Sequence, residues 1–530
     1  MRKAILIVLC WLCCGQLSAQ QHNQLHLDKL NQAYTYLRNN YVDDVDLEPL
    51  VEAALEATFK ELDPHSSYLT REEFMAMYEG IQGEYSGVGF GMITLRDTLI
   101  VTHTLAGSPS ERAGVKKNDR IISVNGISLV GTERQRAVEL LRGKRGSIAT
   151  LSVLRGGEEL TIDVVRDDIA TKAVSDAFML NDSLAYVRVD SFLSKTTTEE
   201  FIAAMNGLRG AESLILDLRG NIGGLLPSAV QFSELFLKRG DLIVTIEGRK
   251  SSTTYQASKN GLYDYMPVVV LIDEDTASAS EIVAGALQDH DRAVIVGRRS
   301  FGKGLVQKLI KFKDDSGMRI TTSRYKTPSG RIIQRPYSNG EHEAYINDRE
   351  RFSPLDTASM PDSLLYTTLK SGRKVYGGGG ITPDIYIASD STTLTPFTRT
   401  MIERGLVQIA IIDIFDRTPI DDFKALYPTA EELMENYSLD DFTIKLLASQ
   451  VGDDTEGEFD DVSIEECRAI IAAQIAEEAY MSGLYYKLYG RHHDFTLIRA
   501  IEIIGDKLFQ KRILSPITPQ NEQSNLCNLL

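Results

Sequence analysis

The sequence predicts a multidomain α/β protein in which a mixed core lies between two helical regions. The chain has 530 residues, more than one hydrophobic core accommodates, and it is 43% hydrophobic and 25% charged, as ordinary globular proteins are. Residues 169–390 alternate short apolar runs with amphipathic runs of helical period, which indicates strands alternating with helices. Residues 20–83 and 391–530 instead show helical spacing of their apolar residues.

The amino terminus is typical of a signal peptide, which we place at residues 1–19. A basic pair at residues 2–3 precedes an apolar run over residues 4–14, and small residues suited to cleavage end at Ala19. The apolar run is too short to span a bilayer comfortably. We therefore expect an exported, periplasmic protein. A lipid-anchored form held at a membrane through Cys14 is the alternative.

Charge and cysteine content exclude several classes of partner and cofactor. The formal net charge is −17 at pH 7, and such acidity argues against nucleic acid and anionic lipid as partners. Only Cys467 and Cys527 follow the leader, and they make neither a disulfide framework nor a metal-ligand spacing. We accordingly predict no metal and no other cofactor.

The first helical region, residues 20–83, contains two predicted helices. The dipeptide Asp63-Pro64 ends the second of them, because proline cannot continue a helix. His65 follows directly, and we interpret it as a turn residue rather than a catalytic group.

Residues 84–168 change to short alternating strands. The run Gly87-Val88-Gly89-Phe90 opens this series, and a short helix and a strand-to-turn segment follow. The segment resembles a PDZ domain. The resemblance implies that residues 87–90 form the loop whose backbone N–H groups capture the terminal carboxylate of a peptide. A glycine-rich hairpin without a ligand is the alternative.

In the mixed core, a serine stands between a predicted strand and a predicted helix. Residues 268–272 are an apolar run typical of a buried strand, residues 282–287 have helical spacing, and Ser278 lies between them. Strand, sharp turn, hydroxyl and helix are the arrangement that exposes a nucleophile at the mouth of a sheet. Serines before a helix are also common N-caps, and Ser280 with Glu281 fits that role.

A lysine between two glycines, Lys303, is the candidate partner of this serine. No carboxylate lies nearby in the sequence to pair its charge. A lysine held in a water-poor pocket has a lowered pKa and can act as a general base toward a serine. The same segment imitates a phosphate-binding loop, but Gly304 stands where such a loop needs Ser or Thr, and a strand-like run follows instead of a helix.

A third segment supplies a candidate oxyanion hole. Residues 214–218 indicate a buried strand that runs into a glycine turn at 220–224, and a helix follows. Backbone N–H groups at such a turn lie near the positive end of a helix dipole. They can bind the oxyanion of an acyl-transfer intermediate.

These segments resemble the carboxy-terminal processing, or tail-specific, peptidases. The matching stretches are LDPHSSYLT (62–70), DLRGNIGGLL (217–226), TASASEI (276–282), FGKGLVQ (301–307), RYKTPSGRIIQ (324–334) and GITPDI (380–385). The resemblance covers roughly residues 30–390. It implies a crotonase/ClpP-like α/β core at 169–390. The polar and proline-rich stretch at about 336–379 interrupts this core and indicates an inserted surface segment.

The resemblance also implies the roles of three side chains and the activity. Ser278 is the nucleophile, Lys303 is the general base, and Gln307 positions the lysine. We therefore predict an exported serine endopeptidase with a Ser–Lys dyad that cleaves proteins near their carboxy termini. The PDZ domain would bind the substrate tail and gate the activity.

For the oxyanion hole, the resemblance implies the backbone N–H groups of Gly224 and Ala279, with Gly223 as the alternative to Gly224. The sequence departs mildly from the family at Gly220 and Ile222. Neither position needs a side chain for the chemistry.

Rival mechanisms find little support. A Ser–His–Asp triad would need a histidine near Ser278, but His290 lies ~18 Å further along the same predicted helix at ~1.5 Å per residue. No H-E-x-x-H zinc motif is present, and residues 492–494 (His-His-Asp) have no metal-ligand spacing. The alternative function is a PDZ-containing binding protein with a degenerate hydrolase core, which predicts loss of Ser278, Lys303 or the glycine turn.

The sequence assigns no role to the carboxy-terminal helical region, residues 391–530. Thr429 and Ser463 each begin an S/T-x-x-E pattern that predicts a capping box at a helix start, and residues 453–461 indicate an acidic linker. As partners we expect protein or peptide substrates with free carboxy termini. An adaptor protein and a homo-oligomer formed through the helical regions stay open.

Overall fold

The structure is a computed structural model that describes residues 24–506 and residue 514. Its internal gaps are 83, 96, 106, 171, 339, 347–360, 389–393, 451–459, 481–482 and 491–492. The predicted leader and Cys527 lie outside the described residues, as do most of the acidic linker and part of the predicted insertion. The described chain separates into two compact units, of which the smaller comprises the residues up to Phe74, Leu309–Ile320 and Tyr337–Ile346.

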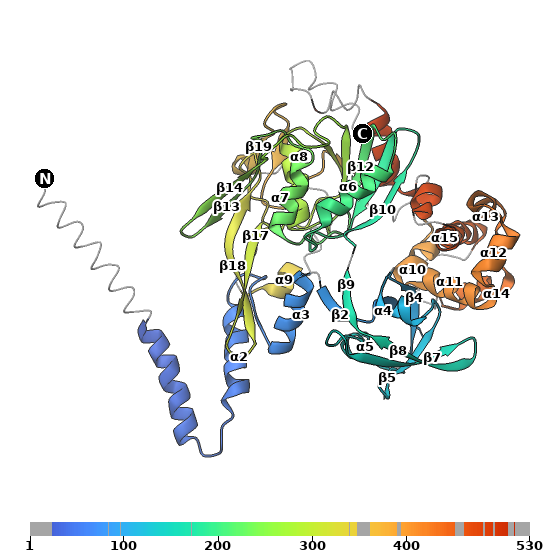
Figure 1. Ribbon diagram of the computed structural model, residues 1–530. Helices are drawn as coiled ribbons and strands as arrows, with labels where there is room; N and C mark the ends of the chain where they lie inside the picture. The colour runs from blue at the N-terminus through green and yellow to red at the C-terminus, as the bar shows by residue number, and fades with distance from the viewer. Residues whose placement is uncertain are drawn as a thin grey trace, which may run out of the picture. The chain divides into compact units, whose positions relative to one another are not determined.

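The smaller unit combines the amino-terminal segment with two short segments from the middle of the chain. Its elements are a helix at residues 24–40, α2 (Leu47–Lys60), β1 (Ser67–Leu69), the start of α3 (Arg71–Gln82) and α9 (His342–Ile346) (Figure 1). β1 pairs antiparallel with residues 317–319 of β18 (Gly317–Lys326). His65 lies in a turn, as predicted, and its ring Nε2 is 3.1 Å from the Tyr345 hydroxyl.

A six-stranded sheet forms the centre of the larger unit. Its strand order is β10 (Val174–Met179), β11 (Leu184–Val189), β12 (Ser213–Asp217), β15 (Val268–Ile272), β16 (Val294–Gly297) and β21 (Ile385–Tyr386). β10 is antiparallel to β11, and the remaining neighbours are parallel. All five residues of β15 are buried, because a parallel sheet is covered on both faces. The carboxyl ends of β12 and β15 therefore meet at one edge of the sheet.

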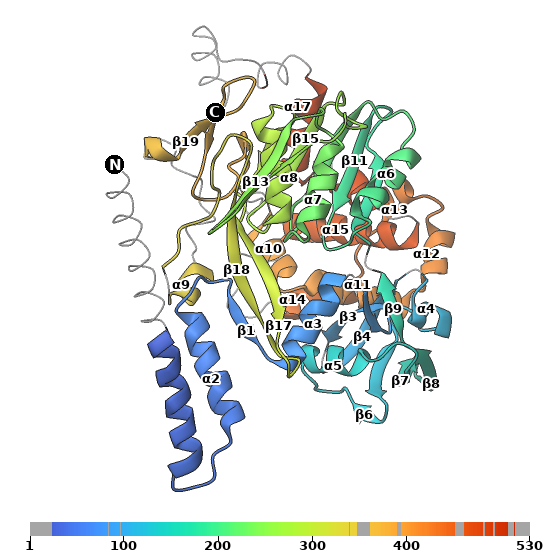
Figure 2. The ribbon, with the colours of Figure 1, turned by 60° about the vertical axis from the view of Figure 1, so that its left-hand side comes forward.

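Helices from distant parts of the chain cover the two faces of this sheet. One face packs against α6 (Thr197–Gly207), α7 (Leu226–Glu234) and α8 (Ala279–Asp289). The other face packs against α17 (Phe495–Gly505) (Figure 2). Its Leu497, Ala500 and Ile503 are fully or nearly fully buried. The last described helix is thus part of the core of the central sheet, although it falls within the predicted carboxy-terminal helical region.

A second sheet carries the segment that follows Lys303. β13 (Leu242–Gly248) pairs with β14 (Ser252–Gln256) and with the last residues of β18, and β17 (Leu305–Lys311) also pairs with β18. The described part of the predicted insertion contains η2 (Asp362–Leu364) and a hairpin of β19 (Leu365–Thr367) and β20 (Lys374–Tyr376).

The predicted PDZ segment forms its own antiparallel sheet and core. The strand order is β3 (Phe90–Leu95), β4 (Thr98–Thr104), β5 (Arg120–Val124), β7 (Ile148–Arg155) and β8 (Glu158–Val165), with β6 (Ile127–Ser128) paired to β5. Two helices, α4 (Pro109–Ala113) and α5 (Arg134–Leu141), accompany it. β2 (Glu84–Gly87) pairs with β9 (Asp167–Ala170), which brings the two ends of the segment together.

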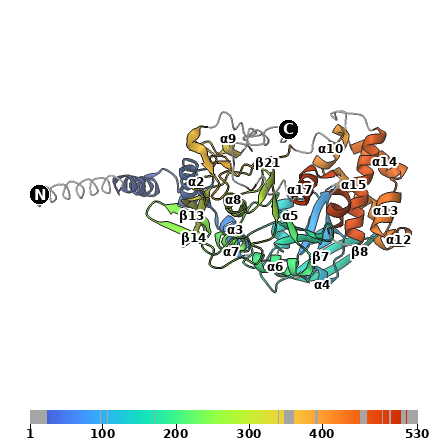
Figure 3. The ribbon, with the colours of Figure 1, turned by 90° about the horizontal axis from the view of Figure 1, so that it is seen from above.

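Apart from α17, the described helices after residue 395 lie together (Figure 3) and share a separate apolar core. They are α10 (Pro396–Glu403), α11 (Leu406–Arg417), α12 (Ile420–Leu426), α13 (Ala430–Asn436), α14 (Asp441–Gln450), α15 (Asp461–Ala479) and the π-helix η4 (Tyr485–Gly490). We call α10–α15 the helical bundle. Within the described ranges, no helix has the length and apolar character needed to cross a membrane.

One of the two predicted capping boxes is misplaced. Thr429 is the N-cap of α13 and accepts from the Glu432 backbone N–H, as the pattern predicts. The N-cap of α15 is Asp460, not Ser463, which is buried in the first helical turn and itself donates its backbone N–H to Asp460. An aspartate three residues earlier is an equally good cap, and the sequence pattern cannot rank the two.

Candidate active site

Ser278 lies at the turn between β15 and α8, in a backbone conformation that is rare for residues other than glycine. Its φ is 56° and its ψ is −112°, and it occupies the N-cap position of α8. Such strained positions cost free energy and cluster at functional sites, where the surrounding structure holds them. The residue is half-buried.

The prediction that Ser280 caps α8 is wrong. Ser280 is fully buried in the first turn of the helix, and its Oγ donates to the Asn221 carbonyl oxygen at 3.0 Å. The hydroxyl therefore ties α8 to the glycine turn. The sequence places two serines near the helix start, and only the backbone geometry decides which one is the N-cap.

Glu281 holds the two candidate catalytic segments together. Its buried carboxylate accepts four hydrogen bonds: Oε1 from the Ser300 Oγ at 2.5 Å and the Gly302 N–H at 2.7 Å, and Oε2 from the Ser278 N–H at 2.7 Å and the Lys303 N–H at 2.9 Å. The backbone nitrogens of Ser278 and Lys303 thus converge on a single oxygen atom. From the sequence alone, Glu281 is expected only as a capping residue beside Ser280.

Burial and hydrogen bonding act on Glu281 in opposite directions. Complete burial raises the pKa of its carboxyl group, and the four donated hydrogen bonds lower it, with burial the larger effect. A carboxylate within a helix whose every residue is buried is unusual unless it is satisfied by donors. That pattern, an acid inside an apolar helix, is the sequence signal that could have identified Glu281.

Lys303 and Gln307 lie on one continuous segment that leads into the second sheet. Lys303 is half-buried between Gly302, whose φ is 86°, and Gly304, whose N–H donates to Gln334 Oε1 at 2.8 Å. Gln307 is the third residue of β17 and is also half-buried. The structure therefore brings the Lys303 backbone to the serine turn and places Gln307 just beyond it.

The glycine turn after β12 packs directly against Ser278. A Cβ added to Gly223 would lie 2.9 Å from the Ser278 Cβ and 2.8 Å from the Ala279 nitrogen, and φ there is 96°. A Cβ on Gly224 would lie 2.2 Å from the Phe192 carbonyl carbon, with φ at 155°. Both positions therefore require glycine for close approach as well as for backbone conformation.

The backbone amide groups of this turn favour Gly224 over Gly223 as the oxyanion donor. The Gly223 N–H donates to Asn221 Oδ1 at 2.9 Å, so it is already engaged. Among the described residues, no hydrogen-bond partner is found for the Gly224 or the Ala279 amide. The arrangement therefore leaves Gly224 and Ala279 as candidate oxyanion donors.

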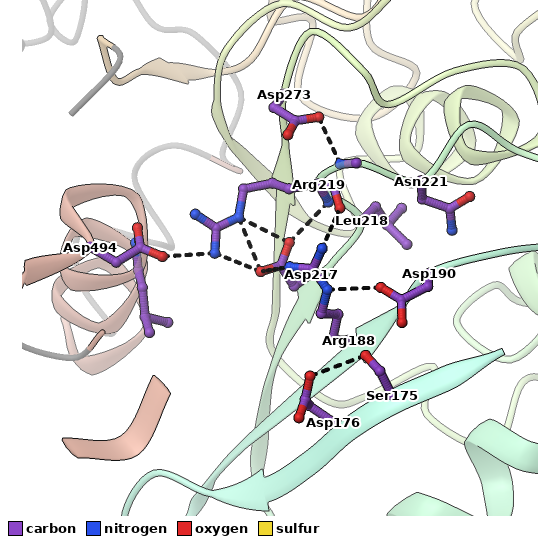
Figure 4. Close-up of polar contacts among 12 residues, drawn as sticks. Ser175, Asp176, Arg188, Asp190, Asp217, Leu218, Arg219, Asn221, Asp273 and Asp494 are labelled. Carbon is purple, nitrogen blue, oxygen red and sulfur yellow. Dashed lines mark hydrogen bonds and ion pairs between the residues drawn. The ribbon is translucent and has the colours of Figure 1, made fainter. Parts of the chain in front are cut away.

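Ion pairs fix the start of the glycine turn (Figure 4). Asp217, the last residue of β12, is fully buried and accepts from Arg219 Nε and Nη2, and from the Tyr186 hydroxyl at 2.7 Å. Burial alone would raise the pKa of Asp217, but Arg219 and then Arg188 outweigh it and hold that pKa below its usual value. The pKa of Arg219 is raised in turn by Asp217 and Asp494, against the effect of burial.

The described rival histidines make contacts elsewhere in the fold. His290 is the C-cap of α8, at the opposite end from Ser278, and its Nε2 lies 2.7 Å from the Leu242 carbonyl oxygen. The ring of His493 stacks on Tyr489 at a centroid distance of 4.2 Å. Within the described part of the chain, no cluster of three or more His, Cys, Asp or Glu residues could hold a metal ion.

The predicted carboxylate loop joins β2 to β3. Gly87 ends β2, Phe90 begins β3, and Val88 is buried between them. Gly89, at φ 78°, has its carbonyl oxygen fixed by the Ser110 hydroxyl at 2.7 Å. β3 is the first strand in the order of its sheet, so one of its edges is unpaired among the described residues.

Three protein-family models match the chain. A peptidase family S41 model matches residues 183–338, a PDZ domain model matches residues 100–155, and an activating protease CtpB N-terminal domain model matches residues 14–73. The first match contains the serine turn, the lysine segment and the glycine turn. The second contains most of the described PDZ sheet.

Curated relatives and a solved structure are similar over comparable spans. The carboxy-terminal processing protease CtpA of Bacillus subtilis (strain 168) is 33% identical over 64% of this chain and 74% of the relative. A probable CtpA-like serine protease of Staphylococcus aureus (strain MSSA476) is 35% identical over 59% of this chain, which spans 63% of that relative's length. The structure of a photosystem II D1 C-terminal processing protease is 26% identical, covers 68% of this chain and 86% of its own, and has a TM-score of 0.38.

Proposed function

The chain belongs to the carboxy-terminal processing proteases of peptidase family S41, and from this premise we propose that it is a serine endopeptidase with a Ser278–Lys303 dyad. The observation that carries the proposal is the Glu281 carboxylate, which holds the backbone N–H groups of both residues on one oxygen. Proteins with free carboxy termini are the proposed substrates, cleaved near those termini. A crotonase/ClpP-like arrangement of the core is part of the same proposal.

In the proposed acylation step, Lys303 acts as a neutral amine. It takes the proton of the Ser278 hydroxyl while Oγ attacks the scissile carbonyl carbon. The backbone N–H groups of Gly224 and Ala279 stabilise the oxyanion of the tetrahedral intermediate. The lysine then gives its proton to the leaving amine, and water hydrolyses the acyl-enzyme by the reverse sequence. Gln307 orients the lysine and transfers no proton.

Replacing each of the two neighbouring serines tests the nucleophile. Ser278→Ala should abolish cleavage of an internally quenched peptide that ends in a free apolar carboxy terminus. Ser280→Ala should remain active, because it removes only a hydrogen bond to the Asn221 carbonyl, at about 1 kcal/mol of stability. Full activity in Ser278→Ala would remove the assignment.

The PDZ domain is proposed to bind the substrate tail by strand addition. Support comes from the unpaired edge of β3 and the loop Gly87-Val88-Gly89-Phe90 at its start. An added peptide strand would pair with β3 and place its carboxylate at the backbone N–H groups of the loop. Adaptor binding and self-association find no support among the described contacts.

Gating of the protease by the PDZ domain is proposed as well, and contacts between the PDZ domain and the helical bundle support it. Lys117 pairs with Glu478, and its ammonium lies 4.6 Å from the centroid of the Phe415 ring. Burial lowers the pKa of Lys117 to about 8. Arg120 pairs with Asp416 at 2.7 Å. These contacts would restrain the PDZ domain until a tail binds.

A substitution at this contact tests the gate. Arg120→Ala should change the turnover of a short peptide without a PDZ-binding tail, whereas Arg136→Ala, at an exposed intrahelical pair of the same domain, should not. Equal kinetics for both variants and the unmodified protein would remove gating through this contact.

Export to the periplasm is proposed on the leader at residues 1–19, and recovery of the protein only from the cytoplasm would contradict it.

A further inference from the structure

The last described helix of the chain reaches the loop that carries the candidate oxyanion hole. Asp494 precedes α17, and its Oδ2 lies 2.8 Å from Arg219 Nη2 (Figure 4). We propose that Asp494 is a positioning residue for the oxyanion turn, acting through Arg219. This inference rests on the proposed peptidase function, because it assigns a role toward the same site.

Arg219 is shared between two carboxylates that come from distant parts of the sequence. Its Nη2 contacts Asp217 Oδ2 at 2.6 Å and Asp494 Oδ2 at 2.8 Å, while its Nε lies 3.0 Å from both Asp217 oxygens. The exposed fractions of the Arg219, Asp494 and Asp217 side chains are 14%, 15% and 0%. At such burial, each charge depends on its partners, so the guanidinium has one favoured position.

The position of Arg219 matters because the loop after it lacks regular secondary structure. Side-chain contacts hold its first residues: the Arg219 carbonyl accepts from Arg188 Nη2 at 3.1 Å, and the Gly220 N–H donates to Asp273 Oδ1 at 2.9 Å. Asn221 follows. Its side-chain Nδ2 donates to the Val189 carbonyl oxygen at 2.8 Å, and its side-chain Oδ1 accepts from the Gly223 N–H at 2.9 Å. Backbone hydrogen bonds hold the later part, where the Phe192 N–H donates to the Gly223 carbonyl at 3.0 Å.

These contacts, joined by the chain from Arg219 to Asn221, lead from Asp494 to Gly223, the residue directly before Gly224. Oxyanion donors act only when they are held at the correct position before the reaction, and a displacement of about 1 Å can cost on the order of a hundredfold in rate. Loss of the Asp494 contact leaves Arg219 paired with Asp217 alone, so the start of the loop gains freedom. The expected effect is therefore on turnover rather than on substrate binding.

Asp494 has a second, separable role as the N-cap of α17. Its Oδ1 accepts from the Leu497 backbone N–H at 3.0 Å, while Oδ2 serves Arg219. Asparagine is as good an N-cap as aspartate but carries no charge. Glutamate keeps the charge but is a poorer cap. The two substitutions therefore separate a structural role in the helix from a positioning role in the site.

The first test compares kinetics and thermal stability of three variants. In Asp494→Asn we expect kcat for the internally quenched peptide to fall about fivefold, which corresponds to about 1 kcal/mol. KM should be nearly unchanged, and Tm should be nearly unchanged because asparagine keeps the N-cap. In Asp494→Glu we expect kcat to be largely retained and Tm to fall. The matched control is Asp460→Asn, the same change at the N-cap of α15, which should leave kcat unaltered.

The second test does not depend on catalysis. Hydrogen exchange of the backbone amides at residues 218–224, followed by mass spectrometry, should be faster in Asp494→Asn than in the unmodified protein or in Asp460→Asn. Unchanged exchange together with unchanged kcat in Asp494→Asn would overturn the inference. A kcat that falls only as Tm falls, in both Asn and Glu variants, would also overturn it, since it would indicate a structural role alone.

Failure of the proposed function gives a different result. If the protein does not cleave the peptide, or if Ser278→Ala cleaves it, the peptidase assignment fails. The exchange measurement at residues 218–224 then still decides whether Asp494 positions the loop. If cleavage depends on Ser278 but Asp494→Asn matches the unmodified protein in both measurements, only the positioning role fails.

Discussion

Two strand-to-helix turns meet at the candidate active site and are held by different means. The turn after β15 carries Ser278 and depends on the neighbouring Glu281, whose carboxylate accepts four hydrogen bonds from nearby donors. The turn after β12 carries the candidate oxyanion donor Gly224 and depends on ion pairs of Arg219 with Asp217 and Asp494. The serine turn is supported by its own helix, whereas the glycine turn needs a residue from the far end of the chain.

The largest effect should come from the carboxylate of the serine turn. Glu281→Gln replaces one acceptor oxygen by an NH₂ group, so donors that converge on that oxygen lose their acceptor and face another donor. Because the backbones of Ser278 and Lys303 then lose their common anchor, kcat should fall on the order of a hundredfold. Steady-state kinetics with the quenched peptide measure this fall in kcat. Turnover equal to that of the unmodified protein would show that Glu281 does not position the pair.

An intermediate effect is expected at the ion pairs of the glycine turn. Arg219→Gln leaves the fully buried Asp217 carboxylate with Arg188 as its cationic partner, at 3.6 Å. Breaking a buried pair costs about 3 kcal/mol, and urea unfolding should show a loss of that order in the free energy of unfolding. The double variant Asp217→Asn/Arg219→Gln should be less destabilised than the sum of the single variants, since it removes both charges of the Asp217–Arg219 pair together. Strict additivity would contradict the pairing.

The smallest effect is a difference in pH dependence between the two buried carboxylates. The pKa of Asp217 is lowered, so its contribution to stability is present above its unfolded pKa of ~3.9 and is lost as the pH falls through its folded value. The pKa of Glu281 is raised, so its contribution is fully present below its unfolded pKa of ~4.3 and is lost as the pH rises through its folded value.

Unfolding measurements from about pH 3.5 to pH 7 test this difference. The stability of the unmodified protein relative to Asp217→Asn should decrease as the pH falls. The stability of the unmodified protein relative to Glu281→Gln should instead increase as the pH falls over this range. The same sign of change for both carboxylates would remove the distinction between the two turns.

The sequence predicts the serine turn better than the hydrogen bonds of Ser280 and Glu281 that hold this turn in place. Buried strands at 214–218 and 268–272 and the glycines at 223–224 are local patterns, and the structure places the corresponding elements there. The roles of Ser280 and Glu281 depend on contacts made across the fold, which local spacing does not encode. The capping interpretation of Ser280 was therefore wrong, and the anchoring by Glu281 was missed.

The same limit applies to the carboxy-terminal helices. Helical spacing correctly predicts helices after residue 395, but α17 packs on the central sheet, whereas α10–α15 enclose a core of their own. Apolar residues at helical spacing show that a helix has a buried face, and they do not show what covers it. Asp494 likewise has the sequence signature of an N-cap, and its contact with Arg219 depends on where α17 docks.

The measurement that tests the proposed mechanism most directly is the pH dependence of peptide cleavage by Lys303→Arg, with circular dichroism to confirm folding. Arginine keeps a positive charge but cannot give up its proton, so it cannot act as the base. We expect no turnover by Lys303→Arg at any pH at which the unmodified protein is active. The activity of the unmodified protein should rise as its lysine deprotonates. Cleavage by folded Lys303→Arg at the rate of the unmodified protein would contradict the Ser278–Lys303 dyad.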